Sequence, residues 1–211
     1  MRSTPDYHSY HELARQEPSA HYRIRRARRH SAVLILTPHG GGIEPGTSEL
    51  VLALAGEAYA YYCFEGIRQH GNDRLHITST HFDEPLGREM AASADWVLAV
   101  HGCGDRREKV FIGGLHETWI ERFLQGFGAA GFTAERGFGK ISGRNPRNIC
   151  NHGREGCGVQ MEVSEGLRRR MFGGLDREGR RHPTGLFDAF VRAGREVLAD
   201  AAAPAARSAA G

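Results

Sequence analysis

Two histidines and a glutamate stand next to glycines in a pattern that suits a metal ion. His39 is followed by three glycines and, five positions on, by Glu44. A glycine-rich loop can fold an imidazole and a carboxylate at this spacing toward one point, whereas a helix would point them apart. His101 also precedes a glycine. Two imidazoles and one carboxylate with an open fourth position form a catalytic zinc shell, in which the metal polarises a carbonyl and lowers the pKa of a water.

Both histidines follow segments that have the pattern of buried strands. Residues 32–36 and 96–100 are short continuous apolar runs, and Pro38 stops the first of them. His39 and His101 are therefore expected at the carboxyl ends of two strands. Ligands of open α/β sheets bind outside these ends, so the placement favours a site independently of any motif. Zinc suits this donor set best, although manganese or cobalt could occupy the same ligands.

Other segments alternate between strand and helix patterns. We expect a helix over 47–62 that begins at Thr47 or Ser48, a strand over 75–82, a helix over 115–127, a short strand over 159–163 that carries Glu162, and a final helix from Thr184. Residues 137–157 are rich in Gly, Asn and Arg and predict a long loop. This order predicts an α/β fold with a mixed, largely parallel open sheet covered by helices.

The composition is that of one globular domain. The chain has 211 residues, of which 40% are hydrophobic and 25% charged, and this excludes disorder across the whole chain. The expected organisation is a polar, basic N-terminal lead-in over 1–30, a single catalytic domain over 31–200 and a low-complexity tail over 201–211.

Net charge and the pattern of the first residues bear on partners and location. A formal net charge of +3, from 28 basic and 25 acidic residues, is too weak to imply nucleic acid. The first residues lack an apolar signal-peptide core, and no run approaches the roughly 18 apolar residues of a membrane span. We therefore expect a cytoplasmic monomer without membrane contact, which cell lysis could release.

Four cysteines offer alternatives to this scheme. They are too few for a disulfide scaffold at this length, and no pair has C-x-x-C spacing, so reduced thiols are expected. Cys150, His152 and Cys157 invite a second metal site, but their spacings match no standard structural zinc module. A nucleophilic pair of Cys103 and His101 is the rival enzyme mechanism, although no helix start follows Cys103 to lower the pKa of its thiol.

Several blocks of sequence together resemble the phage-type poly-γ-glutamate hydrolase family. The blocks are HGGGIEPGTSE over 39–49, LHITSTHFDEP over 75–85, VHG over 100–102, NPRNICN over 145–151 and QMEVSEGLR over 160–168. They occur in the expected order and cover roughly residues 30 to 195. The resemblance implies a zinc-carboxypeptidase-like α/β fold, one Zn2+ per chain and cleavage of the γ-amide bonds of poly-γ-glutamate.

The resemblance also implies roles for individual residues. The zinc ligands fall on His39, Glu44 and His101, and the general base falls on Glu162. A carboxylate in that position can take the proton of the attacking water and later hand it to the leaving amine. The alternative is that Glu162 is a buried ion-pair partner of Arg168 or Arg144.

The implied substrate is a polyanion, so its groove needs cations and amide donors near each free carboxylate. Each candidate arginine could instead be a solvated loop charge. The imidazole of His81 could bind substrate or stabilise the oxyanion. The candidates for substrate binding are His81, Arg144, Asn145, Arg147, Asn148 and Arg168.

The basic run over 23–29 leaves a different class of function open. The alternative is a non-catalytic, phage-related accessory protein that binds nucleic acid through this segment. Such a protein would lose affinity steeply as salt rises, because its binding neutralises phosphates. Loss of activity on chelation and its return with zinc would favour the enzyme.

Overall fold

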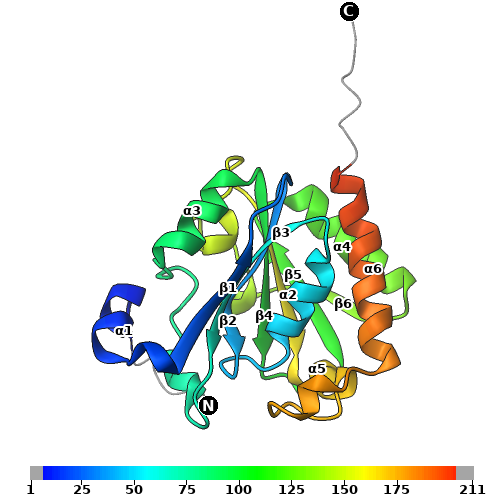
Figure 1. Ribbon diagram of the computed structural model, residues 1–211. Coiled ribbons are helices and arrows are strands. Elements are labelled where there is room, and N and C mark those ends of the chain that lie inside the picture. Colours follow the sequence, from blue (N-terminus) through cyan, green and yellow to red (C-terminus); the bar gives the residue numbers. More distant parts are fainter. Residues whose placement is uncertain (1–6, 203–211) are drawn as a thin grey trace, which may run out of the picture.

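Seven strands form one mixed sheet in the computed structural model, which describes residues 7–202 (Figure 1). The sheet order is β1-β3-β2-β4-β7-β5-β6. The strands β2, β3, β4 and β7 run parallel, whereas β1 is antiparallel to β3, and β5, which is parallel to β6, is antiparallel to β7. This confirms the predicted mixed, largely parallel sheet. The strands are β1 (Tyr22–Ala27), β2 (Val33–Gly41), β3 (Ala60–Gly66), β4 (Trp96–Cys103), β5 (Lys109–Gly114), β6 (Thr133–Arg136) and β7 (Val159–Ser164).

Helices cover both faces of this sheet. In Figure 1, α1 and α3 lie on one side, and α2, α4 and α6 lie on the other. Helix α6 packs against α2, α4 and α5. The helices are α1 (Tyr10–Gln16), α2 (Thr47–Ala55), α3 (Pro85–Ser93), α4 (Glu117–Ala129), α5 (Glu165–Met171) and α6 (Gly185–Ala202).

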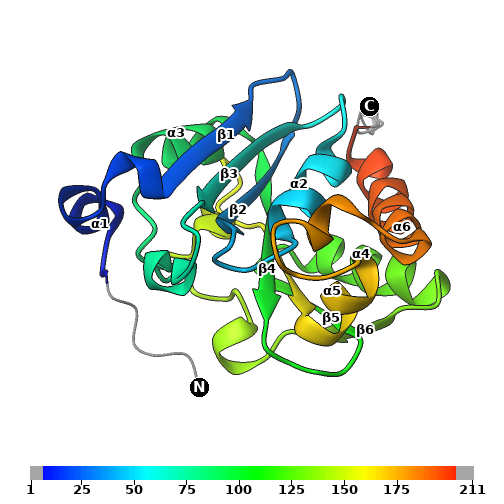
Figure 2. The same ribbon diagram turned by 60° about the horizontal axis from the view of Figure 1, so that its bottom comes forward.

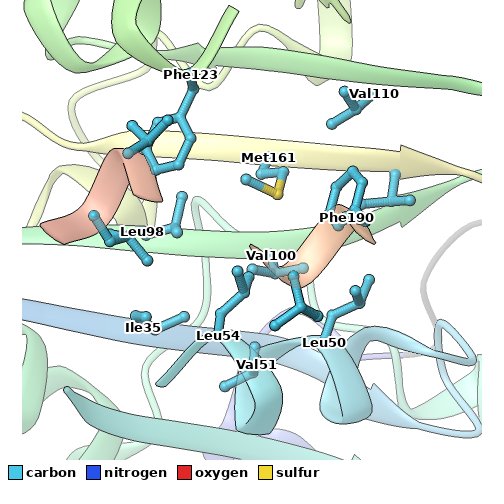
Figure 3. Packing of buried hydrophobic residues seen from close by; sticks show 14 of the residues in the cluster. Ile35, Leu50, Val51, Leu54, Leu98, Val100, Val110, Phe123, Met161 and Phe190 are labelled. Atoms are coloured by element: carbon cyan, nitrogen blue, oxygen red, sulfur yellow. The ribbon is translucent and has the colours of Figure 1, made fainter. Parts of the chain in front are cut away.

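Strand β2 is buried on both faces, which explains its continuous apolar run. Val33 and Ile35 belong to the core beneath α2, α4 and α6, whereas Leu34 and Leu36 belong to the core beneath α1 and α3. Because successive side chains alternate between faces, one strand supports both cores. Figure 3 shows the first core, in which the strand residues Ile35, Leu98, Val100 and Met161 lie among the helix residues Leu50, Leu54, Phe123 and Phe190.

Much of the basic segment over 23–29, expected as part of a lead-in, is an edge strand. β1 pairs with β3 along its whole length. Tyr22 and Ile24 pack against the core, whereas Arg23 and Arg25 both pair with Glu65. Alternating apolar and basic residues suit an edge strand with one solvated face, and edge charges discourage pairing with other chains. The sheet therefore begins inside the expected lead-in.

The helix predicted over 47–62 is shorter in the structure. Gly56, with a φ of 48°, ends α2, and the chain then turns into β3. Gly46, with a φ of 101°, is the N-cap, rather than Thr47 or Ser48. Glycine adopts positive φ without strain, so both helix ends are set by glycines.

The strand predicted over 75–82 is a loop that follows a 3-10 turn, Asn72–Leu75. Both sides of β2 are already occupied by β3 and β4, so this segment cannot join the sheet there. Leu75 and Ile77 are nevertheless buried. Their burial explains the alternation that resembled a strand.

Several remaining features agree with the sequence, and others were not predicted. The long loop over 137–157 is confirmed apart from short 3-10 turns at Gly139–Ile141 and Ile149–Asn151. The final helix predicted from Thr184 is α6, and the strand predicted over 159–163 is β7. No pattern predicted β5, β6, α1, α3 or α5. The tail predicted over 201–211 lies outside the described residues from residue 203 on. Within residues 7–202, no helix is both long and apolar enough to cross a membrane.

Candidate active site

The loop after β2 brings His39 and Glu44 together. The register of β2 against β3 shifts just before Gly40, so the strand is irregular where His39 lies. Gly41 has a φ of 65°, and a Cβ on Gly40 would lie 2.4 Å from the Ser48 hydroxyl, so both positions require glycine. The backbone N–H of Glu44 donates to the carbonyl oxygen of His39 at 2.9 Å and closes the loop.

His39, Glu44 and His101 form a buried cluster. His101 comes from β4, which pairs with β2. His39 Nδ1 lies 3.2 Å from Glu44 Oε1, and His101 Nδ1 lies 3.5 Å from Glu44 Oε2. The two Nδ1 atoms are 3.1 Å apart. The structure therefore brings together the three side chains that the sequence proposes as metal ligands.

Contacts on the far side of each ring aim the Nδ1 atoms inward. His39 Nε2 lies 2.7 Å from the carbonyl oxygen of Ile77, which can only accept, so Nε2 donates there and Nδ1 is left facing Glu44. His101 Nε2 lies 3.4 Å from Ser79 Oγ. A tetrahedral site with bonds of about 2.1 Å has donor atoms about 3.4 Å apart. The donor types and their spacing both fit a zinc ion.

The carboxylate of this cluster is ionised. Burial alone would raise the pKa of Glu44, but the charges and hydrogen bonds of His39 and His101 outweigh burial and hold the pKa well below its usual range. The backbone N–H of Gly102 also donates to Glu44 Oε2 at 2.7 Å. An ionised carboxylate is the form that binds a metal.

Glu162 lies next to this cluster on the neighbouring strand. It is opposite His101 in the parallel pairing of β4 and β7, and its side chain lines the same cavity. Gln160 Nε2 donates to Glu162 Oε1 at 3.0 Å. Arg144, one of the alternative ion-pair partners, pairs with Glu117 at 2.8 Å. Glu162 is therefore a buried carboxylate in the lining of the cavity, and its role as general base stays a prediction.

The cavity has a volume of about 610 Å³ and opens at the carboxyl ends of β2 and β4. Figure 2 turns this end of the molecule toward the reader. The lining comes from four segments, which are the loop after β2, residues 73–80, the end of β4, and the long loop together with β7. The placement agrees with the expectation that ligands bind outside the carboxyl ends of the strands.

The long loop places one predicted substrate residue at the cavity. Asn148 lines it, is buried, and donates to Gln160 Oε1 at 2.7 Å. Asn145 Oδ1 accepts from the backbone N–H of Arg147 at 2.9 Å, and both residues are exposed outside the lining. Contacts of Asn145 and Arg147 with substrate stay predictions.

The other three predicted substrate residues also lie outside the lining. His81 and Arg144 are exposed. Arg168 is buried and ties together the loop after β2, the end of β4 and β7. It does so by donating to the carbonyl oxygens of Pro45, Cys103 and Val163. Substrate contacts of these residues stay predictions too.

Among the lining residues that the sequence did not single out, His76 and Lys140 have basic side chains. The His76 ring stacks on His39 with centroids 3.9 Å apart, and its Nε2 lies 3.7 Å from Glu44 Oε1. Lys140 is the only lysine or arginine among the described residues that line the cavity. The sequence could have drawn attention to Lys140, because only two of the 28 basic residues are lysines. His76 was not singled out, because its segment was predicted to be a strand.

The cysteine alternatives gain little from the structure. Cys103 lines the cavity, but burial raises the pKa of its thiol, which disfavours a thiolate nucleophile. Cys150 is buried, with its thiol 3.7 Å from the carbonyl oxygen of Gly143. Among the described residues, Cys150, His152 and Cys157 do not form a metal-binding cluster.

Known proteins resemble this chain in sequence and in overall structure. The sequence matches the model of a family described as poly-gamma-glutamate hydrolase over residues 7–193. It is 37% identical to the UPF0714 protein YmaC of Bacillus subtilis (strain 168) over 199 residues, which cover 92% of this chain and 84% of YmaC. A solved bacteriophage poly-gamma-glutamate hydrolase superposes with a TM-score of 0.91 at 31% identity, covering 93% of this chain and 98% of that chain. The zinc-free form of YndL, a Bacillus subtilis relative, superposes with a TM-score of 0.90 at 33% identity and the same coverage.

Proposed function

This chain belongs to the poly-γ-glutamate hydrolase family and is a hydrolase, and we propose that it cleaves the γ-amide bonds of poly-γ-glutamate or a related γ-glutamyl amide with zinc as its metal. His39, Glu44 and His101 would hold one zinc ion at the catalytic site. The observation that carries the proposal is the convergence of two imidazole Nδ1 atoms and an ionised carboxylate in one cavity with Glu162.

The residues of the cavity divide the chemistry between them. Zinc held by this set would polarise the scissile carbonyl and lower the pKa of a water. Glu162 accepts a proton from the attacking water and hands it to the leaving nitrogen, so that a neutral amine departs. Gln160 fixes the Glu162 carboxylate, and Asn148 fixes Gln160 in turn. This chain of hydrogen bonds keeps the base oriented before substrate arrives.

A cation at the cavity would favour a substrate that carries carboxylates over a neutral amide. Every γ-linked residue carries a free α-carboxylate beside the amide bond, and a neutral amide does not. Lys140 lines the cavity and is exposed, so its ammonium group is available to that carboxylate. Arg147, exposed on the same loop, extends positive charge toward further residues of the polymer.

Digestion of two polymers tests the proposal. Chelator-stripped protein is incubated with poly-γ-glutamate and with α-linked polyglutamate, each with and without added zinc. We expect short oligomers only from the γ-linked polymer and only with zinc. His101→Ala is the control and should release nothing. Cleavage of neither polymer, or of both equally, by the zinc-loaded protein would contradict the proposed substrate.

The alternative of nucleic acid binding through residues 23–29 gains no support from the side chains there. Arg23 and Arg25 pair with Glu65, and Arg28 pairs with Glu89 at 2.7 Å. These acidic partners neutralise charge that phosphates would otherwise attract. We therefore confine the proposal to the hydrolase.

A further inference from the structure

A second group of metal-binding side chains lies at the opposite end of the sheet from the catalytic cavity. It consists of His116, from the turn between β5 and α4, and of Glu155 and Cys157, from the loop that leads into β7. Trp96, which contacts the His116 ring, opens β4, whereas His101 lies near the other end of that strand. At about 3.3 Å per residue, the strand keeps the two clusters well apart.

The three donor atoms lie within 4.8 Å of one another. His116 Nε2 lies 3.4 Å from Glu155 Oε2, and Cys157 Sγ lies 4.0 Å from the same oxygen. A tetrahedral zinc site has nitrogen and oxygen donors about 3.4 Å apart and sulfur and oxygen donors about 3.6 Å apart, from its usual bond lengths. The distance between nitrogen and oxygen fits such a site, and the distance between sulfur and oxygen exceeds it by about 0.4 Å.

Backbone contacts hold the two segments of this cluster in register. The N–H groups of Leu115 and His116 both donate to the carbonyl oxygen of Gly158 at 3.0 Å, and the N–H of Glu155 donates to the carbonyl oxygen of Asp95 at 2.9 Å. A Cβ on Gly158 would lie 1.9 Å from the carbonyl oxygen of Cys150, so this point of the loop beside the cluster requires glycine. Binding there needs little ordering of the chain.

The imidazole is also prepared for a metal. Its ring lies edge-on to Trp96 and Trp119, at centroid distances of 5.7 and 6.2 Å, and this contact sets its orientation. Glu155 is half exposed, so the fourth position of the tetrahedron faces solvent.

We propose that His116, Glu155 and Cys157 form a second metal site that binds a borderline-soft divalent cation such as Zn2+ or Co2+, with water as the fourth ligand. The thiolate and imidazole donors select against Mg2+ and Ca2+, which prefer oxygen. On binding, the S–H bond of Cys157 breaks, a bond from sulfur to the metal forms, and one proton passes to the buffer. The proposal of this second site does not depend on the proposed hydrolytic function, and each can be tested without the other.

Cobalt absorption distinguishes this site from the catalytic one, because only this cluster contains sulfur. Co2+ is titrated into chelator-stripped, full-length His101→Ala protein under reducing conditions. We expect a thiolate-to-cobalt charge-transfer band that saturates near one equivalent, with quenching of tryptophan fluorescence, since the two tryptophans of the chain both contact His116. Adding Cys157→Ser to this protein should abolish the band, whereas adding Cys103→Ser should leave it.

Two further measurements decide the remaining possibilities. His116→Asn in the His101→Ala background should weaken cobalt binding at least tenfold, so that the test does not depend on one variant. Cys157→Ser alone should hydrolyse poly-γ-glutamate within about twofold of the wild-type rate. A charge-transfer band that never forms, or that persists after Cys157→Ser, would overturn the second site. Loss of hydrolysis in Cys157→Ser would overturn its independence from the catalytic site.

Discussion

Glu162 is the residue whose replacement separates metal binding from proton transfer. It lines the cavity but lies outside the cluster of His39, Glu44 and His101. Glu162→Gln keeps the size of the side chain and removes the base, so turnover should fall by about 10² to 10⁴ while zinc stays bound. Steady-state kinetics and metal analysis check this, both in a Cys157→Ser background so that the metal count reports the catalytic cluster alone.

The matched control is His101→Ala, which should lose zinc and activity together because it removes a ligand. A folded Glu162→Gln protein without zinc would make Glu162 a ligand and would leave the base to be found elsewhere.

Lys140 is the residue that we expect to distinguish a polyanion from a neutral amide. Lys140→Ala should raise KM for poly-γ-glutamate by on the order of 10-fold and leave kcat little changed, because it removes binding common to ground and transition states. Lys140→Arg should restore most of the affinity. Arg147→Ala, outside the lining, should raise KM for the polymer by less. Equal losses on poly-γ-glutamate and on a small neutral γ-amide would contradict an anchoring role for either residue.

The sequence was most informative about residues at strand ends. His39 and His101 follow apolar runs, which placed them at strand ends. The three glycines after His39 allow the chain to turn so that Glu44 points back toward His39. His76 and Lys140 reach the cavity from segments without regular periodicity. Their positions depend on long-range packing, which no local pattern encodes.

At the scale of elements, Glu17 ties α1 to the sheet. Its carboxylate accepts from the Tyr7 hydroxyl at 2.7 Å and pairs with His21 at 2.6 Å and Arg68 at 3.2 Å. Burial would raise the pKa of Glu17, but these partners lower it below its usual value of 4.5. Because the pKa is lower in the folded state, this carboxylate stabilises the fold above the unfolded-state pKa, and its contribution is lost as pH falls through the folded-state pKa.

We therefore expect Glu17→Gln to lower the free energy of unfolding by about 1–3 kcal/mol at pH 7. The difference from wild type should shrink as pH falls below the usual value of 4.5 and should be lost as pH falls through the lower folded-state pKa. Urea denaturation at pH 7 and at pH 3.5 measures both quantities. An equal difference at the two pH values would show that the charge of Glu17 does not stabilise the fold.

The sequence predicted β2 and β4 as strands but did not predict β1 or β5. β2 and β4 are buried on both faces, so their apolar runs are unbroken. β1 is an edge strand that contains several arginines, and its sequence pattern is equally typical of a solvated segment before the first strand. β5 pairs antiparallel with β7. This pairing depends on how the whole sheet is assembled, so the local sequence of β5 does not reveal it.

For the whole molecule, α6 closes one face of the sheet through Phe190. This side chain is fully buried, stacks on Phe127 with centroids 4.4 Å apart, and meets Phe132 edge-on at 5.2 Å. Phe190→Ala should lower the free energy of unfolding by about 3–5 kcal/mol, from lost burial and the cavity left behind. Arg192→Ala, exposed on the same helix, should change it by less than about 0.5 kcal/mol. Denaturant titrations of both variants test this, and similar losses in the two would contradict a core role for Phe190.

The place of β7 in the chain has a consequence for the order in which the protein matures during translation. Among the described residues, β7 is the last strand to be synthesised, yet it inserts between β4 and β5, and only there does Glu162 come to lie opposite His101. The three proposed metal ligands leave the ribosome earlier, on β2, its following loop and β4. Since chains fold from the N-terminus during synthesis, the proposed ligands precede the proposed base. Under the proposed mechanism, a nascent chain lacks its general base until β7 is in place.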